Sequence, residues 1–283
     1  MQFRIDHKTT YSYTAPVFLE PFAVRLRPKT DINQRLLEFE LEINPIPTGR
    51  TEVNDLDGNV TALLWFSDLH DHLRIRSRSV VETCLDNPFN FLIADPDCQS
   101  IPVSYSKQAR ESLRAYREPL NASSEPVRKL LDEVSGSSSS NETITFLSQL
   151  CRVIHSRVTP VLRHEGAPYS PEESLEKGTG ACRDLAVLFI EACRHVGLAS
   201  RFVSGYHEVS SELPAEHLHA WAEVYLPGGG WRGFDPTNGF AVADRHVAVA
   251  TGASPEHAAP TSGSFRGTGV ESQMSVELTI ETS

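Results

Sequence analysis

The sequence predicts an α+β protein, with strands at its start and helices packed on a sheet in its second half. In the first hundred residues apolar and polar side chains alternate, which is typical of strands with one face in water. From Ala109 onward apolar residues recur at helical spacing, and short strand patterns return after Gly197. We therefore expect an N-terminal antiparallel β-sandwich or barrel over 1–100, a helical connection over 101–140, and a second domain with a C-terminal strand over 141–283.

Composition limits the classes of function. The 283 residues carry a formal net charge of −11, whereas nucleic-acid binding requires clustered lysines and arginines. Polar residues interrupt the sequence directly after Met1, so no signal peptide or membrane-spanning helix is readable. The five cysteines are odd in number and lack CxxC spacing, which indicates a reducing compartment. We expect a cytoplasmic protein that binds neither nucleic acid nor membrane.

Charged residues mark two of the expected strands. Segment 37–43 alternates apolar residues with glutamates, and segment 73–81 alternates them with arginines. These strands could pair as neighbours in register, but we favour two independently solvated faces. Residues 54–59, Asn-Asp-Leu-Asp-Gly-Asn, predict a turn between strands. A calcium loop is the alternative, but its glycine and closing glutamate do not fall where an EF-hand needs them.

Helical spacing of apolar residues follows in three segments. Helices are expected near 109–116, where Pro119 ends the pattern, near 127–134 and near 147–154, the last capped by Asn141. The Ser- and Gly-rich residues between the second and third helix form a surface connection.

The next two helices lead to a cysteine. Residues 170–173, Ser-Pro-Glu-Glu, form a capping box with proline at the first helical position, and Gly178 ends this short helix. Apolar residues then follow helical spacing up to the stop at Gly197. This places Cys182 at a helix N-terminus, where the positive end of the helix dipole favours a thiolate. The alternative is a buried, inert cysteine.

Short strands come after this helix. They are expected at 200–206, 219–226 and 231–234, with glycines 228–230 as the hairpin turn between the last two. His219 and the residue that ends the following strand should therefore be neighbours. A loop rich in Gly, Ser and Pro over 251–269 leads to a final strand near the C-terminus.

The strand ends supply a base and its orienting group. A thiol nucleophile needs a base within hydrogen-bond reach, and that base needs a third group to fix its tautomer. Cys182, His219 and Asp235 meet this requirement if the helix N-terminus packs against the adjacent strands. Cys182 would attack a carbonyl, His219 would protonate the leaving amine, and Asp235 would hold the imidazole.

These motifs resemble the transglutaminase-like superfamily. The similarity lies in Gly-x-Cys-x-Asp at 180–184, His-Ala-Trp-Ala-Glu-Val-Tyr at 219–225 and Asp-Pro-Thr at 235–237, in that order. Residues 201–206 resemble the strand that follows the nucleophile helix in this family. The opening Tyr-Ser-Tyr-Thr-Ala-Pro-Val at 11–17 and the β-rich start look like the N-terminal region of the bacterial branch.

The resemblance implies a papain-like α+β core and a Cys-His-Asp triad, carried here onto Cys182, His219 and Asp235. It also implies an acyl-enzyme formed on a peptide or protein substrate. Water would resolve this intermediate by hydrolysis and an amine would resolve it by transamidation; we favour hydrolysis, as in a cysteine protease or amidase. Nothing resembles the calcium sites of the animal enzymes, so no metal or other cofactor is expected.

Two further assignments stay open. The backbone N–H of Cys182 should serve the oxyanion, with a second donor that the sequence does not assign. His155, Arg163, His164 and Tyr169 lie upstream where it could originate, but the favoured interpretation of each is an ordinary surface or packing residue. Asp184 is expected to complement the helix dipole, with a catalytic part as the less favoured reading.

Two rival functions also need testing. One is a zinc site built from Glu216, His217, His219 and Cys182, which lacks an HExxH motif or paired CxxC. The other is a non-catalytic binding module that retains the fold.

Overall fold

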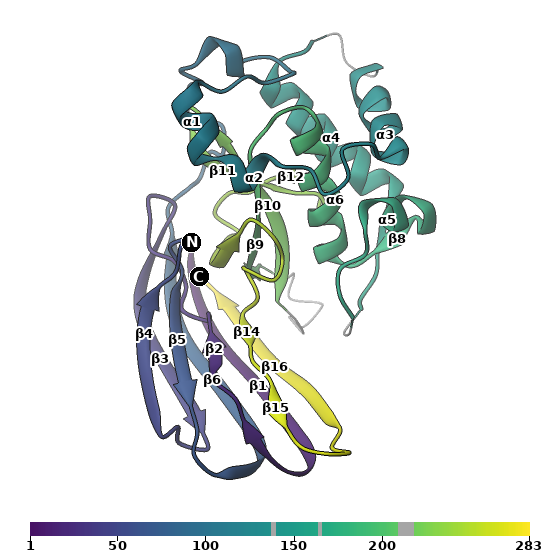
Figure 1. Ribbon diagram of the computed structural model, residues 1–283. Helices are drawn as coiled ribbons and strands as arrows, with labels where there is room; N and C mark the ends of the chain where they lie inside the picture. The colour runs from purple at the N-terminus through teal and green to yellow at the C-terminus, as the bar shows by residue number, and fades with distance from the viewer. Residues whose placement is uncertain (137–139, 164–165, 209–217) are drawn as a thin grey trace.

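The computed structural model describes residues 1–136, 140–163, 166–208 and 218–283 (Figure 1). Its N-terminal strands and the last strands of the chain form one body of antiparallel sheets. The helices gather around a second antiparallel sheet in the other body (Figure 1). The predicted α+β fold class, with a β-rich N-terminal part and helices packed on a sheet, is confirmed.

Two antiparallel sheets make the N-terminal body. One has the strand order β15–β1–β6–β3, with β16 also beside β1, and the other has the order β14–β2–β5–β4. Val17, Leu64 and Ile75 are fully buried in the core that the two sheets share. The strands are β1 (Gln2–Leu19), β2 (Phe22–Val24), β3 (Gln34–Asn44), β4 (Gly49–Asn54), β5 (Val60–Trp65), β6 (Leu69–Thr83), β14 (Thr261–Ser262), β15 (Phe265–Arg266) and β16 (Ser272–Thr282).

The second body is built on a sheet with the order β12–β11–β10–β9–β13. Its strands are β9 (Ser200–His207), β10 (His219–Leu226), β11 (Gly230–Asp235), β12 (Phe240–Ala241) and β13 (His246–Gly252). A short parallel pair, β7 (Thr159–Pro160) and β8 (Thr179–Gly180), lies beside the helices. The helices are η1 (Pro96–Cys98), α1 (Lys107–Ser112), α2 (Arg114–Arg117), α3 (Glu125–Gly136), α4 (Thr143–Arg157), α5 (Pro171–Lys177) and α6 (Cys182–His195).

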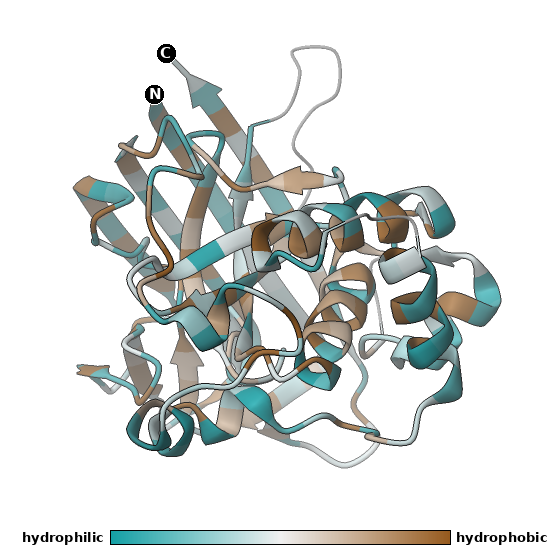
Figure 2. Ribbon diagram, turned by 90° about the horizontal axis from the view of Figure 1, so that it is seen from above, coloured by the Kyte–Doolittle hydropathy of each residue, from teal (hydrophilic) through white to brown (hydrophobic). Residues whose placement is uncertain are grey.

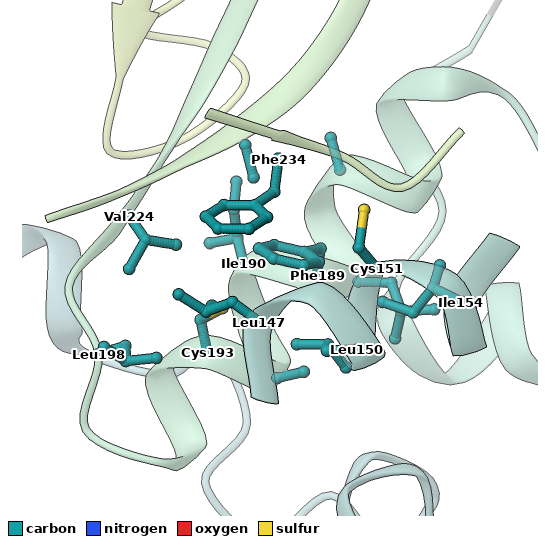
Figure 3. Close-up of a cluster of buried hydrophobic side chains, with 14 of the residues drawn as sticks. Leu147, Leu150, Cys151, Ile154, Phe189, Ile190, Cys193, Leu198, Val224 and Phe234 are labelled. Atoms are coloured by element: carbon teal, nitrogen blue, oxygen red, sulfur yellow. The ribbon is translucent and has the colours of Figure 1, made fainter. Parts of the chain in front are cut away.

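Helices α4 and α6 bury their apolar faces against this sheet. Leu147 and Leu150 of α4 and Phe189 of α6 meet Val224 and Phe234 of the strands (Figure 3). The rings of Phe189 and Phe234 stack with centroids 5.7 Å apart. Hydrophobic and hydrophilic residues alternate along the helices (Figure 2), as expected for elements with one buried face.

The acidic and basic strands are neighbours, which corrects the expectation of two independent faces. β3 pairs with β6 in a register that sets Glu40 opposite Arg78 and Glu42 opposite Arg76. Arg78 Nη2 lies 2.8 Å from the carboxylate of Glu40 and 2.5 Å from that of Glu42. Opposite charges that face each other across an antiparallel pair stabilise this register. The two charged faces therefore lie side by side and are not solvated independently.

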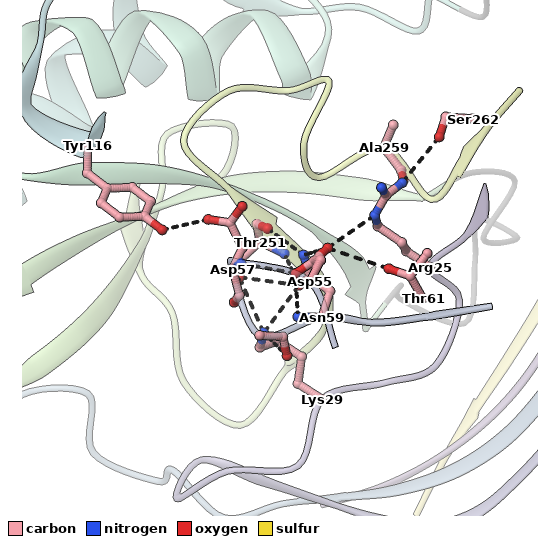
Figure 4. A network of polar contacts seen from close by, with 11 residues as sticks. Arg25, Lys29, Asp55, Asp57, Asn59, Thr61, Tyr116, Thr251, Ala259 and Ser262 are labelled. Carbon is pink, nitrogen blue, oxygen red and sulfur yellow. Dashed lines mark hydrogen bonds and ion pairs between the residues drawn. The ribbon is translucent and has the colours of Figure 1, made fainter. Parts of the chain in front are cut away.

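The turn at 54–59 forms as predicted, and other protein groups hold its carboxylates. Asp55 accepts hydrogen bonds from the backbone amides of Asp57 and Asn59, at 3.0 and 2.9 Å. It also forms an ion pair with Arg25 at 3.3 Å. Tyr116, which lies on α2, donates to Asp57 at 2.6 Å (Figure 4). The turn therefore joins the N-terminal body to the helical one.

Two local expectations were wrong. Asn141 does not cap α4, because the helix begins at Thr143 with Glu142 at the cap and no side-chain cap bond. The segment 251–269 is not simply a loop, since β14 and β15 fall within it and pair with β2 and β1. Part of the predicted surface connection, 137–139, lies outside the described residues.

The division into segments 1–100, 101–140 and 141–283 stays a prediction, but strand pairing adds a fact to it. The C-terminal strand β16 pairs with β1 from Phe3↔Thr282 to Tyr13↔Ser272, so the chain ends in the N-terminal sheet. The amide of Gln2 also donates a hydrogen bond to the carbonyl of Ser283 at 2.9 Å.

All five cysteines are free. No helix among the described residues is both long enough and apolar enough to cross a membrane.

Candidate active site

The predicted nucleophile lies where the sequence places it, on the first residue of α6. The capping box at Ser170 starts α5, and Gly178 ends it with the left-handed φ of 62° that glycine tolerates best. The chain then passes through β8 to Ala181, which caps α6, and Cys182 follows half-buried. The helix beyond it is held in the core by apolar residues, so the thiol is fixed at a rigid helix N-terminus.

Asp184 has a structural part in this arrangement. Its carboxylate is fully buried and accepts from the amide of Ala181 at 2.7 Å and from that of Tyr169 at 2.8 Å. Arg163 completes the set with an ion pair of 2.6 Å, and its guanidinium lies 3.9 Å from the ring centroid of Tyr169. Both carboxylate oxygens are therefore engaged in holding the chain before Cys182. Of the candidate oxyanion donors, Arg163 and Tyr169 take part in this packing, and His164 lies outside the described residues.

The predicted base and its orienting group lie side by side at the start of β10 and the end of β11. His219 begins β10 and Asp235 ends β11, and the two strands pair as the predicted hairpin. His219 Nε2 lies 2.7 Å from Asp235 Oδ2, and the Asp235 carboxylate is fully buried. Cys182 lies near enough to the same imidazole to be one of the groups that raise its pKa. The structure thus brings together all three residues that the sequence singled out.

Asp235 is held by more groups than the sequence suggested. Its Oδ1 accepts from the amides of Thr237 and Asn238, at 2.9 and 3.3 Å. Its Oδ2 accepts from the side-chain amide of Asn238 at 2.7 Å and bonds His246 Nε2 at 3.0 Å. Burial favours the neutral acid, but the charge and hydrogen bond of His219 and the contacts of His246 hold the pKa of Asp235 well below its usual range.

The same contacts set the charge of the base. Burial disfavours the imidazolium of His219, but the charge and hydrogen bond of Asp235, with Cys182, outweigh burial and raise its pKa to about 10. The neighbouring imidazoles behave differently. Burial lowers the pKa of His207 to about 3 and also lowers that of His246. One charged imidazole therefore stands beside two neutral ones.

Three polar residues of this site were missed at the sequence level. Asn238 had a local signal, since an amide three residues after an aspartate in a proline turn can bond that aspartate. His207 and His246 had none, because they reach the site from β9 and β13, whose pairing brings them opposite each other. His155 Nδ1 lies 2.8 Å from the carbonyl of Thr237, so it supports the turn after β11.

Asp235 and two neighbouring histidines form a group of residue types that suits a metal ion. His207, Asp235 and His246 each offer a ligand atom, and these atoms lie within 4.8 Å of one another. This group differs from the zinc site considered from the sequence. Two residues of that site, Glu216 and His217, lie outside the described residues.

Comparisons with known proteins agree with this architecture. Residues 3–82 match the family described as the bacterial transglutaminase-like N-terminal region, and residues 122–236 match the transglutaminase-like superfamily. The second match contains Cys182, His219 and Asp235.

Relatives extend over nearly the whole chain. An uncharacterised protein of Mycobacterium leprae is 26% identical over 282 residues, which is 98% of each chain. One from Mycobacterium tuberculosis H37Rv is 26% identical over 275 residues, covering 89% of this chain and 83% of its own.

A solved structure shares the fold. The crystal structure of a "putative cysteine protease" from Cytophaga hutchinsonii superposes with a TM-score of 0.73 at 20% identity, covering 100% of this chain and 91% of its own. Family and geometry together support a thiol-dependent enzyme in the broad sense. Residues 122–236 thus belong to the transglutaminase-like superfamily, and residues 3–82 form the bacterial transglutaminase-like N-terminal region that precedes them.

Proposed function

We propose that this protein hydrolyses peptide or amide bonds through an acyl-enzyme on Cys182. The observation that carries the proposal is the contact of His219 with both Asp235, at 2.7 Å, and Cys182. A cysteine at a helix N-terminus beside an imidazolium is the setting in which a thiolate forms at neutral pH. An Asp-oriented histidine next to it is the arrangement that thiol acyl transfer requires.

In this proposal the two nitrogens of His219 have different tasks. Nε2 is engaged by Asp235, which leaves Nδ1 to exchange a proton with the sulfur of Cys182. Asp235 fixes the ring orientation and stabilises its positive charge. Because Asp235 is itself held by Thr237, Asn238 and His246, its carboxylate gives His219 an acceptor at a fixed position.

The reaction then follows in two steps. The Cys182 thiolate attacks the carbonyl carbon, and His219 gives its proton to the leaving amine as the carbon–nitrogen bond breaks, which yields a thioester. Water next attacks the thioester while His219 takes a proton from it, and the carboxylic acid leaves as the thiol is restored. The N–H of Cys182 at the helix start is the proposed donor to the oxyanion in both steps.

Hydrolysis is the proposed outcome, in a cytoplasmic setting and without a cofactor. The free state of all five cysteines is compatible with a reducing compartment. An amine in place of water in the second step gives transamidation with the same three residues. The two reactions differ only in whether water or an amine accepts the acyl group, so the assay must offer both.

The test is a paired assay on the purified protein and its Cys182→Ala variant. Peptide and isopeptide mixtures report hydrolysis as new amino termini, and a glutamine peptide with a labelled primary amine reports transamidation as incorporated label. We expect new amino termini with the wild type and none above background with Cys182→Ala. Cys84→Ala is the matched control, because this thiol is exposed in the N-terminal body, and it should keep full activity.

Other outcomes have defined meanings. Label incorporation without new termini would replace hydrolysis with transamidation. Unchanged turnover in Cys182→Ala would refute the thiol mechanism. Equal alkylation of Cys182 and Cys84 by iodoacetamide, with no effect of His219→Ala on Cys182, would favour a non-catalytic binding module.

A further inference from the structure

Three imidazoles surround the buried carboxylate of Asp235, and the proposed reaction uses one of them. His207 on β9 lies opposite His246 on β13 in the strand register, and their ring centroids are 4.5 Å apart. The ring of His219 lies 5.4 Å from that of His207 and 6.0 Å from that of His246. A ring of histidines around one carboxylate is a common composition for a site that binds a divalent cation.

The two additional histidines carry buried nitrogens without partners. Among the described residues, neither His207 Nε2 nor His246 Nδ1 has a hydrogen-bond partner, and both atoms are shielded from solvent. The His246 side chain is 1% exposed, so no solvent contact replaces the missing bond. Buried polar atoms in folded proteins are nearly always paired, and an unpaired one points to a missing ion or water.

We propose that His207, Asp235 and His246 form a binding site for a divalent cation of the zinc type, which competes with His219 for Asp235. The ligand atoms already lie within 4.8 Å of one another, so an ion placed among them would be close to all three. Imidazole nitrogen and carboxylate oxygen are both ligands that zinc and cobalt accept. Cys182 is not a ligand in this site.

Occupation of the site would have a defined effect on the base, a consequence that rests on the proposed function. Asp235 Oδ2 is the atom that bonds both His219 and His246. A cation bound to this oxygen would take the place of the hydrogen bond that orients His219. The ion would then inhibit reversibly, by disconnecting the base from its orienting group while leaving the sulfur free.

The binding test uses the Cys182→Ala protein without an affinity tag, so it does not depend on activity. Co²⁺ is titrated and followed by its visible absorption, and Zn²⁺ is then added in a chelator buffer to displace it. We expect one equivalent of bound Co²⁺ that Zn²⁺ displaces. His207→Phe and His207→Ala should weaken binding by more than about tenfold, since each removes a ligand. His257→Ala, at an exposed histidine outside the cluster, should not.

The opposing results are equally specific. Binding that is present in the wild type but absent in Cys182→Ala, or a thiolate-to-cobalt band, would move the cation to the sulfur and overturn the proposal. Equal binding in the wild type and in both His207 variants, with folding checked by thermal unfolding, would overturn it too. If wild-type activity is found, its half-inhibition by Zn²⁺ should shift by the same factor as binding in His207→Phe.

Discussion

At the scale of single residues, the proposed mechanism depends most on Asp235, whose buried carboxylate lies 2.7 Å from His219 Nε2. A buried carboxylate is stable only when several donors compensate for lost hydration, and here His219, His246, Asn238 and the amide of Thr237 do so. Removing the charge of Asp235 should therefore change the pKa of His219.

The change Asp235→Asn tests this coupling. In the wild type the alkaline limb of kcat/KM should lie near pH 10, where His219 loses its proton. Without the carboxylate charge, only Cys182 opposes the effect of burial on the ring, so the pKa of His219 falls and the limb should move to lower pH. Because the folded-state pKa lies above the unfolded value of 6.5, this stabilisation is complete below pH 6.5 and is lost as pH rises through about 10.

Two measurements check this prediction. The pH profile of kcat/KM should shift in Asp235→Asn, and urea unfolding between pH 6 and 10 should show a smaller loss of stability than in the wild type. The loss of kcat/KM at neutral pH should be smaller than in Cys182→Ala. An unmoved alkaline limb would mean that Asp235 does not control His219.

His246 is expected to stabilise Asp235 without touching the sulfur. In His246→Phe the ring volume stays but the 3.0 Å bond to Asp235 is lost, which should lower the free energy of unfolding by about 1.5–3 kcal/mol. The pKa of Asp235 should rise, so activity should fall at the acidic end of the profile more than at neutral pH. His246→Gln offers a nitrogen donor and should restore part of both. Equal losses in the two variants would argue for packing alone.

These residues show where prediction from sequence ends. Cys182, His219 and Asp235 stand in short motifs at a helix start and at strand ends, so local pattern was enough to select them. His207 and His246 stand in no motif. They reach Asp235 because β9 lies between β10 and β13, and this strand order is a property of the whole sheet.

At the scale of elements, α6 positions the sulfur, and Asp184 ties its first turn to the preceding segment. Asp184→Ala should lower the free energy of unfolding by about 3 kcal/mol, because it leaves Arg163 and two amides without their buried acceptor. This value is the low end of the range for buried pairs, since the Arg163 side chain is 19% exposed. The alkaline limb of the kcat/KM profile should stay at the wild-type pH, because Asp184 is not among the groups that shift the pKa of His219.

Glu133→Ala, at an ion pair between α3 and α4, is the control for the loss of a carboxylate. It removes an ion pair with Arg157 in which both side chains are nearly half exposed, so less than about 1 kcal/mol should be lost. Chemical denaturation of the two variants and the wild type gives the comparison. Equal losses in the two variants would contradict a structural role for Asp184.

The start and end of a helix could be predicted from sequence where short-range residue patterns determine them, but the partner of a strand could not. The capping box of α5 and the glycine that ends it have clear signatures, and both were found. The partner of the last strand has none, since alternation in β16 fits either sheet equally well. Its pairing with β1 depends on which edge is open after the other strands have paired.

At the scale of the whole molecule, the two bodies are joined through the turn between β4 and β5. Asn59 is 1% exposed, and its side-chain amide donates to the carbonyl of Thr251 at 2.8 Å, while its oxygen accepts from the Thr251 amide at 2.8 Å. Lys29 reaches the same oxygen at 3.2 Å (Figure 4). Thr251 lies on β13, the strand that also carries His246.

This connection predicts that the N-terminal body stabilises the sheet of the candidate site. Asn59→Ala leaves the amide and carbonyl of Thr251 buried without partners, so the free energy of unfolding should fall by at least about 2 kcal/mol. Asn90→Ala, at an exposed position, should change it by less than about 0.5 kcal/mol. Denaturation followed both by tryptophan fluorescence and by circular dichroism should show one shared transition in the wild type. If Asn59→Ala leaves the midpoint unchanged, the turn does not support β13, and the two bodies are stabilised independently.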